Sequence, residues 1–196
     1  MPRPPNPEVR SRLLLRGREV VLDRGFNGCG VQDITDAAGV PKGSFYNYFD
    51  SKEAFAAEIL EEYWQSIEDR HGPILYDARM KPLARVVKFF SALSEDHRQC
   101  NFAFGCLIGN LSLELSNHSE GARQKLSGLF GRWGTALSET LHEAQERAEL
   151  PRERDVEEVA AIMVEAYEGA VMRAKVEQSG SAFDRFENAV LPRLLA

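Results

Sequence analysis

The sequence predicts an all-α protein of about nine helices, with an N-terminal three-helix helix-turn-helix domain over residues 1–50 and a C-terminal helical bundle over residues 51–196. Apolar residues recur three and four apart in successive segments, which is the spacing of an amphipathic helix. Glycine and proline mark the breaks between segments, and no segment alternates like a half-buried strand. With 196 residues, 43% of them hydrophobic, the chain can bury a substantial core.

The first predicted helix covers residues 8–24 and combines an apolar side with several arginines. Gly25 is expected to end it, because glycine closes helices at little conformational cost. We expect this helix to cover the core of the helix-turn-helix. Its apolar residues are Leu13, Leu14, Val20, Val21 and Leu22.

Two short helices joined by a tight turn are predicted between Gln32 and Lys52. The first ends at Gly39, which supplies the left-handed position of a helix end, and the second begins at Pro41, whose fixed φ suits a helix start. Phe45 and Phe49 lie four apart and are expected to pack inward. The residues left on the outer face are Lys42, Ser44, Tyr46, Asn47 and Tyr48.

This outer face favours binding to DNA, because a helix-turn-helix places its second helix in the major groove. Lys42 and Lys52 are expected to hold phosphates, and Asp50 to cap the next helix. Residues 1–7 are expected to form a mobile, proline-rich arm whose Arg3 touches DNA. The predicted DNA-contacting residues are Gln32, Thr35, Lys42, Gly43, Ser44, Tyr46, Asn47, Tyr48 and Lys52.

The charge distribution agrees with this interpretation although the whole chain carries a net charge of −6. Residues 1–52 contain 8 basic and 6 acidic side chains, whereas the remaining residues contain 16 basic and 24 acidic ones. The basic surplus therefore lies at the proposed DNA-binding end, where phosphates would be met.

The run AAGVPKGSFYNYFDSKEAF resembles the DNA-binding signature of the TetR family of bacterial transcriptional regulators. The resemblance covers residues 8–60. It implies a repressor that binds a palindromic double-stranded operator as a homodimer and is released by a small-molecule inducer. A helical hairpin in an unrelated bundle, or a purely structural helical dimer, would leave the polar outer face unexplained.

The C-terminal part is expected to carry the inducer response. A helix over 51–71 would connect it to the DNA-binding domain. Further helices are predicted to end near Gln99, to cover 102–115, and to run from Leu126 to a point before Pro151.

A helix over residues 156–175 is predicted to carry two apolar faces and therefore to need two partners. One would be its own domain, and the other the equivalent helix of a second subunit, together with the last helix of each chain. The residues assigned to the two faces are Val159, Met163, Ala166 and Ala170, and Ala160, Tyr167, Val171 and Ala174.

Two receptors for the inducer are open at this point. The first is a cavity that binds an apolar or weakly acidic ligand reversibly and is lined by aromatic residues, among them Phe102, Trp133 and Tyr167, although such residues are more often ordinary core. The second is a reactive thiol: the stretch around Cys106 resembles the electrophile-responsive, N-ethylmaleimide-responsive repressor-like branch of the family. That resemblance also places Lys175 as a cation near the thiol, while a buried, inert cysteine is the common alternative.

Other classes of function find little support in the residues. Cys106 with His97 or His118 lacks any surrounding hydrolase signature, so we expect no enzyme and no catalytic residue. Four isolated histidines and three cysteines without a CxxC pair favour neither a metal site nor a cofactor. The odd cysteine count and the absence of a leader or membrane-spanning stretch favour a reducing cytoplasm.

Overall fold

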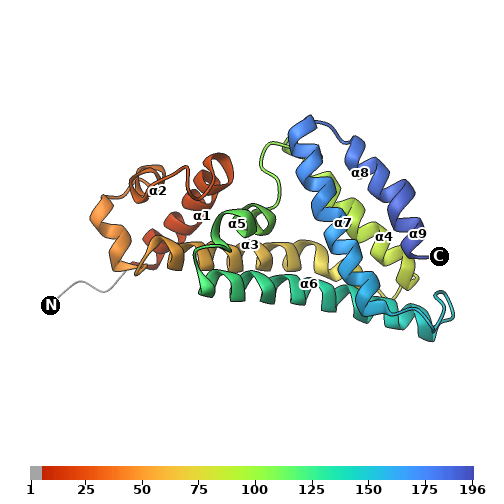
Figure 1. Ribbon diagram of the computed structural model, residues 1–196. Coiled ribbons are helices and arrows are strands. Elements are labelled where there is room, and N and C mark those ends of the chain that lie inside the picture. The colour runs from red at the N-terminus through yellow and green to blue at the C-terminus, as the bar shows by residue number, and fades with distance from the viewer. Residues whose placement is uncertain (1–5) are drawn as a thin grey trace. The chain divides into compact units, whose positions relative to one another are not determined.

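The computed structural model describes residues 6–196, so Arg3 and most of the proline-rich arm lie outside the described residues. Within this range nine α-helices are joined by short connections, a 3₁₀ helix and one π-helical segment (Figure 1). No helix among the described residues is long and apolar enough to cross a membrane. The elements are α1 (Pro7–Arg24), α2 (Val31–Ala38), η1 (Lys42–Asn47), α3 (Lys52–Leu75), α4 (Pro82–Gln99), α5 (Leu107–Leu115), α6 (Glu120–Glu146), α7 (Val156–Glu177), α8 (Ser181–Arg185), η2 (Phe186–Val190) and α9 (Leu191–Leu194).

These helices form two compact units. The first contains the chain up to Trp64 together with Leu107–Leu126, and the second contains Gln65–Cys106 and Ser127–Ala196. Both α3 and α6 contribute residues to each unit. The first unit therefore consists of the helix-turn-helix, the first part of α3, and α5 with the start of α6.

The helix ends of the first unit follow the predictions. Gly25 ends α1 with φ 80°, and Gly39 ends α2 with φ 65° and ψ 40°, both positive-φ conformations that glycine adopts without strain. Asn6 caps α1, and its side chain accepts a hydrogen bond from the Glu8 amide at 3.0 Å. The predicted cap at Asp50 is wrong, because the Ala54 amide donates to the Ser51 hydroxyl at 3.0 Å instead.

The core of the first unit is aromatic and closely packed. Phe45 and Phe49 are buried as predicted, and both lie against Phe55 of α3, with ring centroids 5.6 and 5.2 Å away. α1 approaches this core at Gly17, where a Cβ atom would stand 2.5 Å from Phe55 Cζ and 2.7 Å from Ile34 Cγ2. Only a glycine fits this crossing.

The second unit is built around a cluster of aromatic rings from α4, α7 and the C-terminal segment. Tyr167 is the centre, with its ring 5.2 Å from Phe90, 5.8 Å from Phe183 and 5.4 Å from Phe186. Figure 1 shows α4, α7 and the segment α8 to α9 running side by side. These contacts explain why α7 is apolar over so much of its surface.

A buried ion pair holds α4 against α6. The Arg85 guanidinium donates to Glu143 at 2.7 and 2.8 Å and to the Leu75 carbonyl at 2.9 Å. Arg85 is only 2% exposed, so this bidentate geometry is what compensates for the removal of its charge from water.

Two details of the second part of the chain differ from the predictions. The helix expected to begin near Phe102 begins at Leu107, because Asn101, Phe102 and Gly105 have φ values of 52°, 61° and 70° that no helix accommodates. On α7, both faces assigned from the sequence pack against the chain itself, since seven of those eight residues are buried and Ala166 is half-buried.

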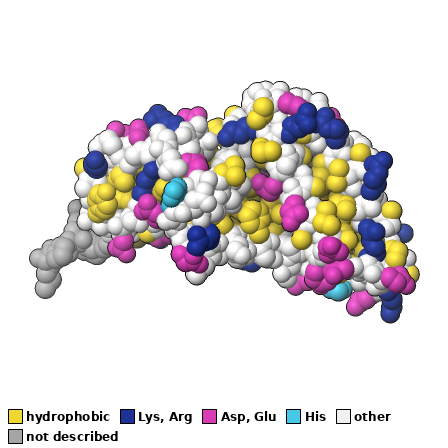
Figure 2. All heavy atoms as spheres, in the orientation of Figure 1, with side chains coloured by type: hydrophobic (Ala, Val, Ile, Leu, Met, Phe, Trp, Pro, Cys, Tyr) yellow, Lys and Arg dark blue, Asp and Glu magenta, His cyan; other side chains and the backbone are white. Residues whose placement is uncertain are grey.

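A different stripe of α7 is exposed. Ile162, Met172 and Val176 are 39%, 61% and 80% exposed, and Gly169 lies on the same stripe. Figure 2 shows hydrophobic side chains gathered over the part of the surface where α7 lies.

Candidate DNA-binding and effector sites

The outer face of the helix-turn-helix is polar and exposed. Tyr46 is 59% exposed, and Gln32, Lys42, Gly43 and Asn47 are also exposed. Ser44 and Tyr48 are half-buried, and the Tyr48 hydroxyl accepts a hydrogen bond from the Asn6 amide at 3.0 Å. Because η1 is a 3₁₀ helix of six residues rather than an α-helix, these groups lie on a tighter turn than the sequence indicated.

Two residues assigned to DNA contact have internal roles. Thr35 is fully buried, and its hydroxyl donates to the carbonyls of Val31 and Gln32 at 3.0 Å, so it is not accessible to a nucleic acid. The Lys52 ammonium donates to the carbonyls of Phe26 and Cys29 and lies 4.1 Å from the centroid of the Phe26 ring. Lys52 thus fixes the loop between α1 and α2.

A carboxylate from α5 holds the same loop from the other side. Glu114 accepts hydrogen bonds from the backbone amides of Phe26 at 2.9 Å and Asn27 at 2.6 Å, one on each oxygen. Next to them burial raises the pKa of the Cys29 thiol, which the charge of Lys52 partly opposes. This loop is therefore fixed by one acidic and one basic side chain, neither of which the sequence pattern revealed as its partner.

Cys106 lies directly before α5, and its thiol is buried. It donates a hydrogen bond to the carboxylate of Glu168 on α7. Lys175, the cation expected beside it, instead donates to the Phe104 carbonyl at 3.1 Å, two residues before the thiol. Lys175 thus lies near the loop that holds Cys106, but the direct partner of the thiol is an acid.

Glu168 was missed because a single glutamate within an amphipathic helix is read as exposed. Its Oε1 atom is fully buried, and it has no hydrogen-bond partner for that oxygen among the residues that the structure describes. Burial raises the pKa of the Glu168 carboxyl to about 7, and the hydrogen bond from Cys106 acts in the opposite direction. Its position between Tyr167 and Ala170, in the most apolar part of α7, was the available signal.

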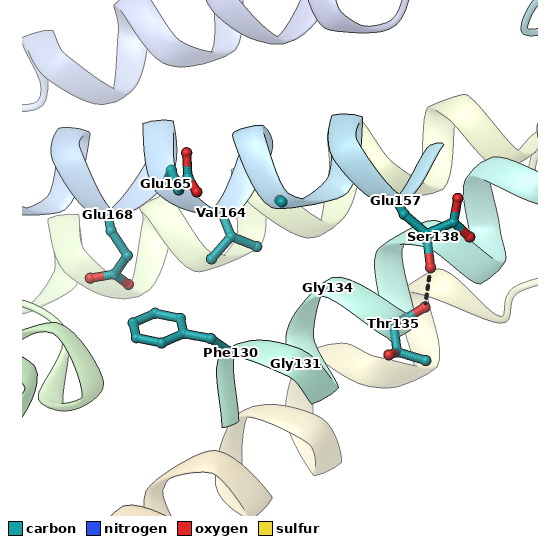
Figure 3. Close-up of a pocket in the computed structure, with 10 residues that line it drawn as sticks. Phe130, Gly131, Gly134, Thr135, Ser138, Glu157, Val164, Glu165 and Glu168 are labelled. Atoms are coloured by element: carbon teal, nitrogen blue, oxygen red, sulfur yellow. Dashed lines mark hydrogen bonds between the residues drawn. The ribbon is translucent and has the colours of Figure 1, made fainter. Parts of the chain in front are cut away.

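A cavity of about 670 Å³ lies between α6 and α7 (Figure 3). Glu168 and Val164 project from α7 towards Phe130 on α6, and the Ser138 hydroxyl donates to the Thr135 carbonyl at 3.2 Å. The lining residues are Phe130, Gly131, Gly134, Thr135, Ser138, Glu157, Ala161, Val164, Glu165 and Glu168. Small and apolar residues thus dominate the α6 side, and carboxylates occur only on the α7 side.

None of the three aromatic residues predicted to line a pocket borders this cavity. Trp133 and Tyr167 are buried core residues whose rings lie 6.0 Å apart, and burial raises the pKa of Tyr167 well above its ordinary value. Phe102 is half-buried, with its ring 6.2 Å from Phe183. The structure therefore assigns them to packing and not to the lining of this cavity.

The groups required for other chemistry are not assembled. His97 stacks on Phe183 at 5.4 Å, and burial lowers its pKa, so it is a neutral packing group. In residues 6–196 no group of three or more His, Cys, Asp or Glu side chains is placed to hold a metal ion.

Comparison with known proteins decides the family. Residues 13–59 match the family described as "Bacterial regulatory proteins, tetR family", and residues 82–190 match "Tetracyclin repressor-like, C-terminal domain". The chain belongs to the TetR family. It is a helix-turn-helix, DNA-binding transcriptional repressor and not an enzyme, as the resemblance of its N-terminal motif implied.

Relatives and solved structures match over nearly the whole chain. The HTH-type transcriptional repressor DhaR of Mycobacterium sp. (strain GP1) is 37% identical over 95% of this chain and 92% of its own length. The repressor NemR of Escherichia coli (strain K12) is 30% identical over 93% and 90%. The crystal structure of the regulatory protein TetR from Rhodobacter sphaeroides gives a TM-score of 0.88 at 31% identity, covering 95% of this chain and 98% of that one. The reduced form of E. coli NemR gives 0.80 at 28%, covering 95% and 94%.

The two hydrogen bonds of Glu114 generate the first prediction. Glu114→Ala should leave the amides of Phe26 and Asn27 without their acceptor, and the loop between α1 and α2 should open more often. Hydrogen bonds to a charged acceptor contribute about 1.5–3 kcal/mol, so hydrogen exchange of these two amides should accelerate about tenfold or more. The measurement is amide exchange followed by NMR or mass spectrometry.

Two comparisons test the specificity of that effect. Glu114→Gln keeps one carbonyl acceptor and should give a smaller acceleration, whereas amides within α4 should exchange as in the wild-type protein. Equal protection of Phe26 and Asn27 in Glu114→Ala would show that the loop does not depend on this carboxylate.

Proposed function

We propose that this repressor is released from its operator when a small electrophile adds to Cys106. The observation that carries the proposal is the position of the thiol. It directly precedes α5, it is hydrogen-bonded to a buried carboxylate that lines a cavity, and α5 carries Glu114. An adduct adds bulk where packing is close, and overpacking of this kind typically costs about 1–3 kcal/mol.

The path from the thiol to the DNA-binding domain would be short. α5 spans nine residues, with Cys106 before its first residue and Glu114 in its last turn. A shift or rotation of α5 would move the Glu114 carboxylate away from the amides of Phe26 and Asn27. The connecting helix α3 supplies Lys52, which also holds this loop. The two helices together would therefore set the position of the outer face of the helix-turn-helix.

A second candidate is favoured by the cavity itself. Its volume of about 670 Å³ suits a small molecule, and its α6 side is mostly apolar. A ligand bound there reversibly would separate or tilt α6 and α7 without forming a covalent bond, and so would release DNA with no change in the mass of the protein.

For the DNA interface, we propose that Ser44, Tyr46 and Asn47 contact base edges and that Lys42 contacts a phosphate. Gln32, Gly43 and Tyr48 complete the surface that faces DNA. Thr35 and Lys52 are left out of the contacting set because one is buried and the other holds the loop.

We also propose a two-fold homodimer through α7 and the C-terminal segment. The exposed residues Ile162, Gly169, Met172 and Val176 follow one another at intervals of seven, three and four, which is the seam of a helix that packs on another helix. In such a dimer the DNA-binding faces of the two subunits are related by a two-fold axis, and they require a palindromic operator.

The DNA interface predicts different effects for a base contact and a phosphate contact. Asn47→Ala should weaken operator binding by roughly 1–3 kcal/mol while binding to unrelated DNA stays the same. Lys42→Ala should weaken both and reduce the slope of log affinity against log salt by about one. Gel shifts with DNA from beside the gene of this repressor, at several salt concentrations, measure both. Lys81→Ala, an exposed cation in the C-terminal part, is the control, and unchanged operator affinity in both variants would contradict the interface.

The dimer predicts that charge on the exposed stripe of α7 separates the subunits. Met172→Glu combined with Val176→Glu should yield a species of 22.0 kDa at micromolar concentration, where the wild-type protein should sediment at twice that mass. Val87→Glu introduces one such charge at another exposed apolar position and should leave the dimer intact, whereas Val176→Glu alone should weaken it. Wild-type protein that sediments as a monomer would rule the dimer out.

If Cys106 is the receptor, release of the operator should require covalent addition to its thiol. Titration with an α,β-unsaturated carbonyl compound should release the operator in step with the appearance of a mass adduct on Cys106. Cys106→Ser should fold, bind the operator and remain bound at the same dose, and Lys175→Met tests whether the nearby cation affects the rate. If Cys106→Ser is released at the same dose as the wild-type protein, the reversible cavity becomes the better account.

A further inference from the structure

Glu168 carries a carboxylate in surroundings that ordinarily exclude one. Its Oε1 atom is fully buried without a hydrogen-bond partner in the described residues, and the Cys106 thiol is the donor to the carboxylate. A buried carboxylate supported only by a weak thiol donor is expensive to maintain. Neither the helix packing of α7 nor the proposed DNA interface uses it.

The carboxylate faces a space that a small molecule can occupy. Glu168 lines the cavity between α6 and α7 and points towards Phe130 (Figure 3). On the α6 side the lining contains Gly131 and Gly134, which leave room, and no charged group. Cys106 itself is not part of the lining, so Glu168, which lines the cavity and accepts the hydrogen bond of the thiol, is the group that connects the two.

We propose that Glu168 accepts the proton of the Cys106 thiol, and that this pair is the receptor for small, uncharged α,β-unsaturated carbonyl compounds that enter through the cavity between α6 and α7. The inference rests on the proposed function in taking Cys106 as the residue that is modified. It adds the base and the selection of uncharged compounds.

The addition balances without any further reactant. The sulfur of Cys106 forms a bond to the β-carbon of the electrophile while its proton passes to the Glu168 carboxylate. The carbon–carbon π bond breaks, and its electron pair moves to the enolate. The proton held by Glu168 then returns to the α-carbon, so the product is a saturated thioether, Glu168 is again a carboxylate, and nothing is oxidised or reduced.

The charges around the cavity select against anions. Three carboxylates, those of Glu157, Glu165 and Glu168, belong to its lining, and no cation does. An anionic electrophile would be repelled by these carboxylates, most strongly near the half-buried Glu168, where the repulsion is screened less than at the exposed Glu157 and Glu165. Uncharged compounds do not meet this barrier.

The titration of Glu168 should appear in the rate of addition. Burial raises the pKa of its carboxyl to about 7, so the fraction present as a base is about one half at pH 7 and is nearly complete about one pH unit higher. The titratable groups around Glu168 are Cys106, Tyr167 and Glu165. The charge of Glu187, in the C-terminal segment, raises the pKa of Tyr167. An unassisted thiol, with an ordinary pKa of about 8.5, would give a rise only at higher pH.

The experiment measures the rate of Cys106 alkylation by N-ethylmaleimide in the full-length protein between pH 5.5 and 9. Peptide mapping separates Cys106 from Cys29 and Cys100, and operator binding is followed in parallel. The wild-type rate should rise about tenfold per pH unit below 7 and level off above it. Glu168→Gln should lose this inflection and react at least tenfold more slowly at pH 7.5. Glu158→Gln, which removes an exposed carboxylate of α7 outside the cavity, should behave as the wild-type protein.

A second comparison tests the selection against charge. N-ethylmaleimide and 3-maleimidopropionate carry the same reactive ring, but only the second is an anion. The rate at which each compound alkylates Cys106 is divided by its rate of reaction with free glutathione, which corrects for intrinsic reactivity. On Cys106 the anionic compound should be at least tenfold slower than the neutral one, and equal normalised rates would overturn this part of the inference.

The possible results distinguish the role of Glu168 from the role of Cys106 in releasing DNA. An unchanged rate and pH profile in Glu168→Gln, with DNA still released, would overturn the role of Glu168 alone. An adduct that depends on Glu168 but leaves the operator bound would support that role and overturn the proposed function, and no adduct on Cys106 would overturn both. If Glu168→Gln does not fold, the wild-type profile and Glu168→Asp decide, since a single rise above pH 8 in both excludes the carboxylate as the base.

Discussion

The hydrogen bonds that fix the loop between α1 and α2 support the whole DNA-binding unit. This loop has backbone groups that no helix satisfies, and two charged side chains supply their partners: Glu114 accepts from its amides and Lys52 donates to its carbonyls. The two side chains come from α5 and α3, which are distant in sequence from the loop and from each other. The orientation of α2 and η1 therefore depends on helices that do not belong to the helix-turn-helix motif.

The second unit contains two charged side chains that differ in how well hydrogen bonds compensate their charge. Arg85 is buried but has a bidentate carboxylate and backbone carbonyls, so its charge is fully compensated. Glu168 is half-buried with its Oε1 atom fully buried, the Cys106 thiol is its donor among the described residues, and burial raises the pKa of its carboxyl. One polar group stabilises the packing of helices, and the other keeps a group that can gain or lose a proton near neutral pH beside a cavity.

Much of the fold followed from local patterns. Helix spacing, Gly25 and Gly39 predicted α1 and α2 nearly to the residue, because helix ends are decided by a few neighbouring positions. The start of α5 was misplaced because the chain takes positive φ values at Asn101 and Phe102 after α4, where the Phe102 amide donates to the His97 carbonyl at 2.8 Å, and an aromatic residue does not mark such a turn in the sequence. The two faces of α7 were misassigned because periodicity shows that a surface is apolar but not which molecule covers it.

The candidate sites were less predictable than the fold for the same reason. The exposed polar residues of η1 could be named from spacing, whereas the roles of Lys52 and Thr35 depend on a loop and a helix turn that only the folded chain brings to them. Glu168 has no sequence neighbour that marks it as special. Its partner, Cys106, lies 62 positions away and meets it only through the packing of α7 against the segment before α5.

The close crossing at Gly17 limits how this sequence can change over time. A glycine within a helix costs about 1 kcal/mol relative to alanine, so replacement by alanine would be favourable if α1 stood alone. Here the added methyl group would meet Phe55 and Ile34, both of which are fully buried. Substitution at position 17 is therefore expected to require compensating changes at both position 55 and position 34. The three positions form a coupled set in which an exchange at one alters which residues the others tolerate, even though none of them touches DNA or an inducer.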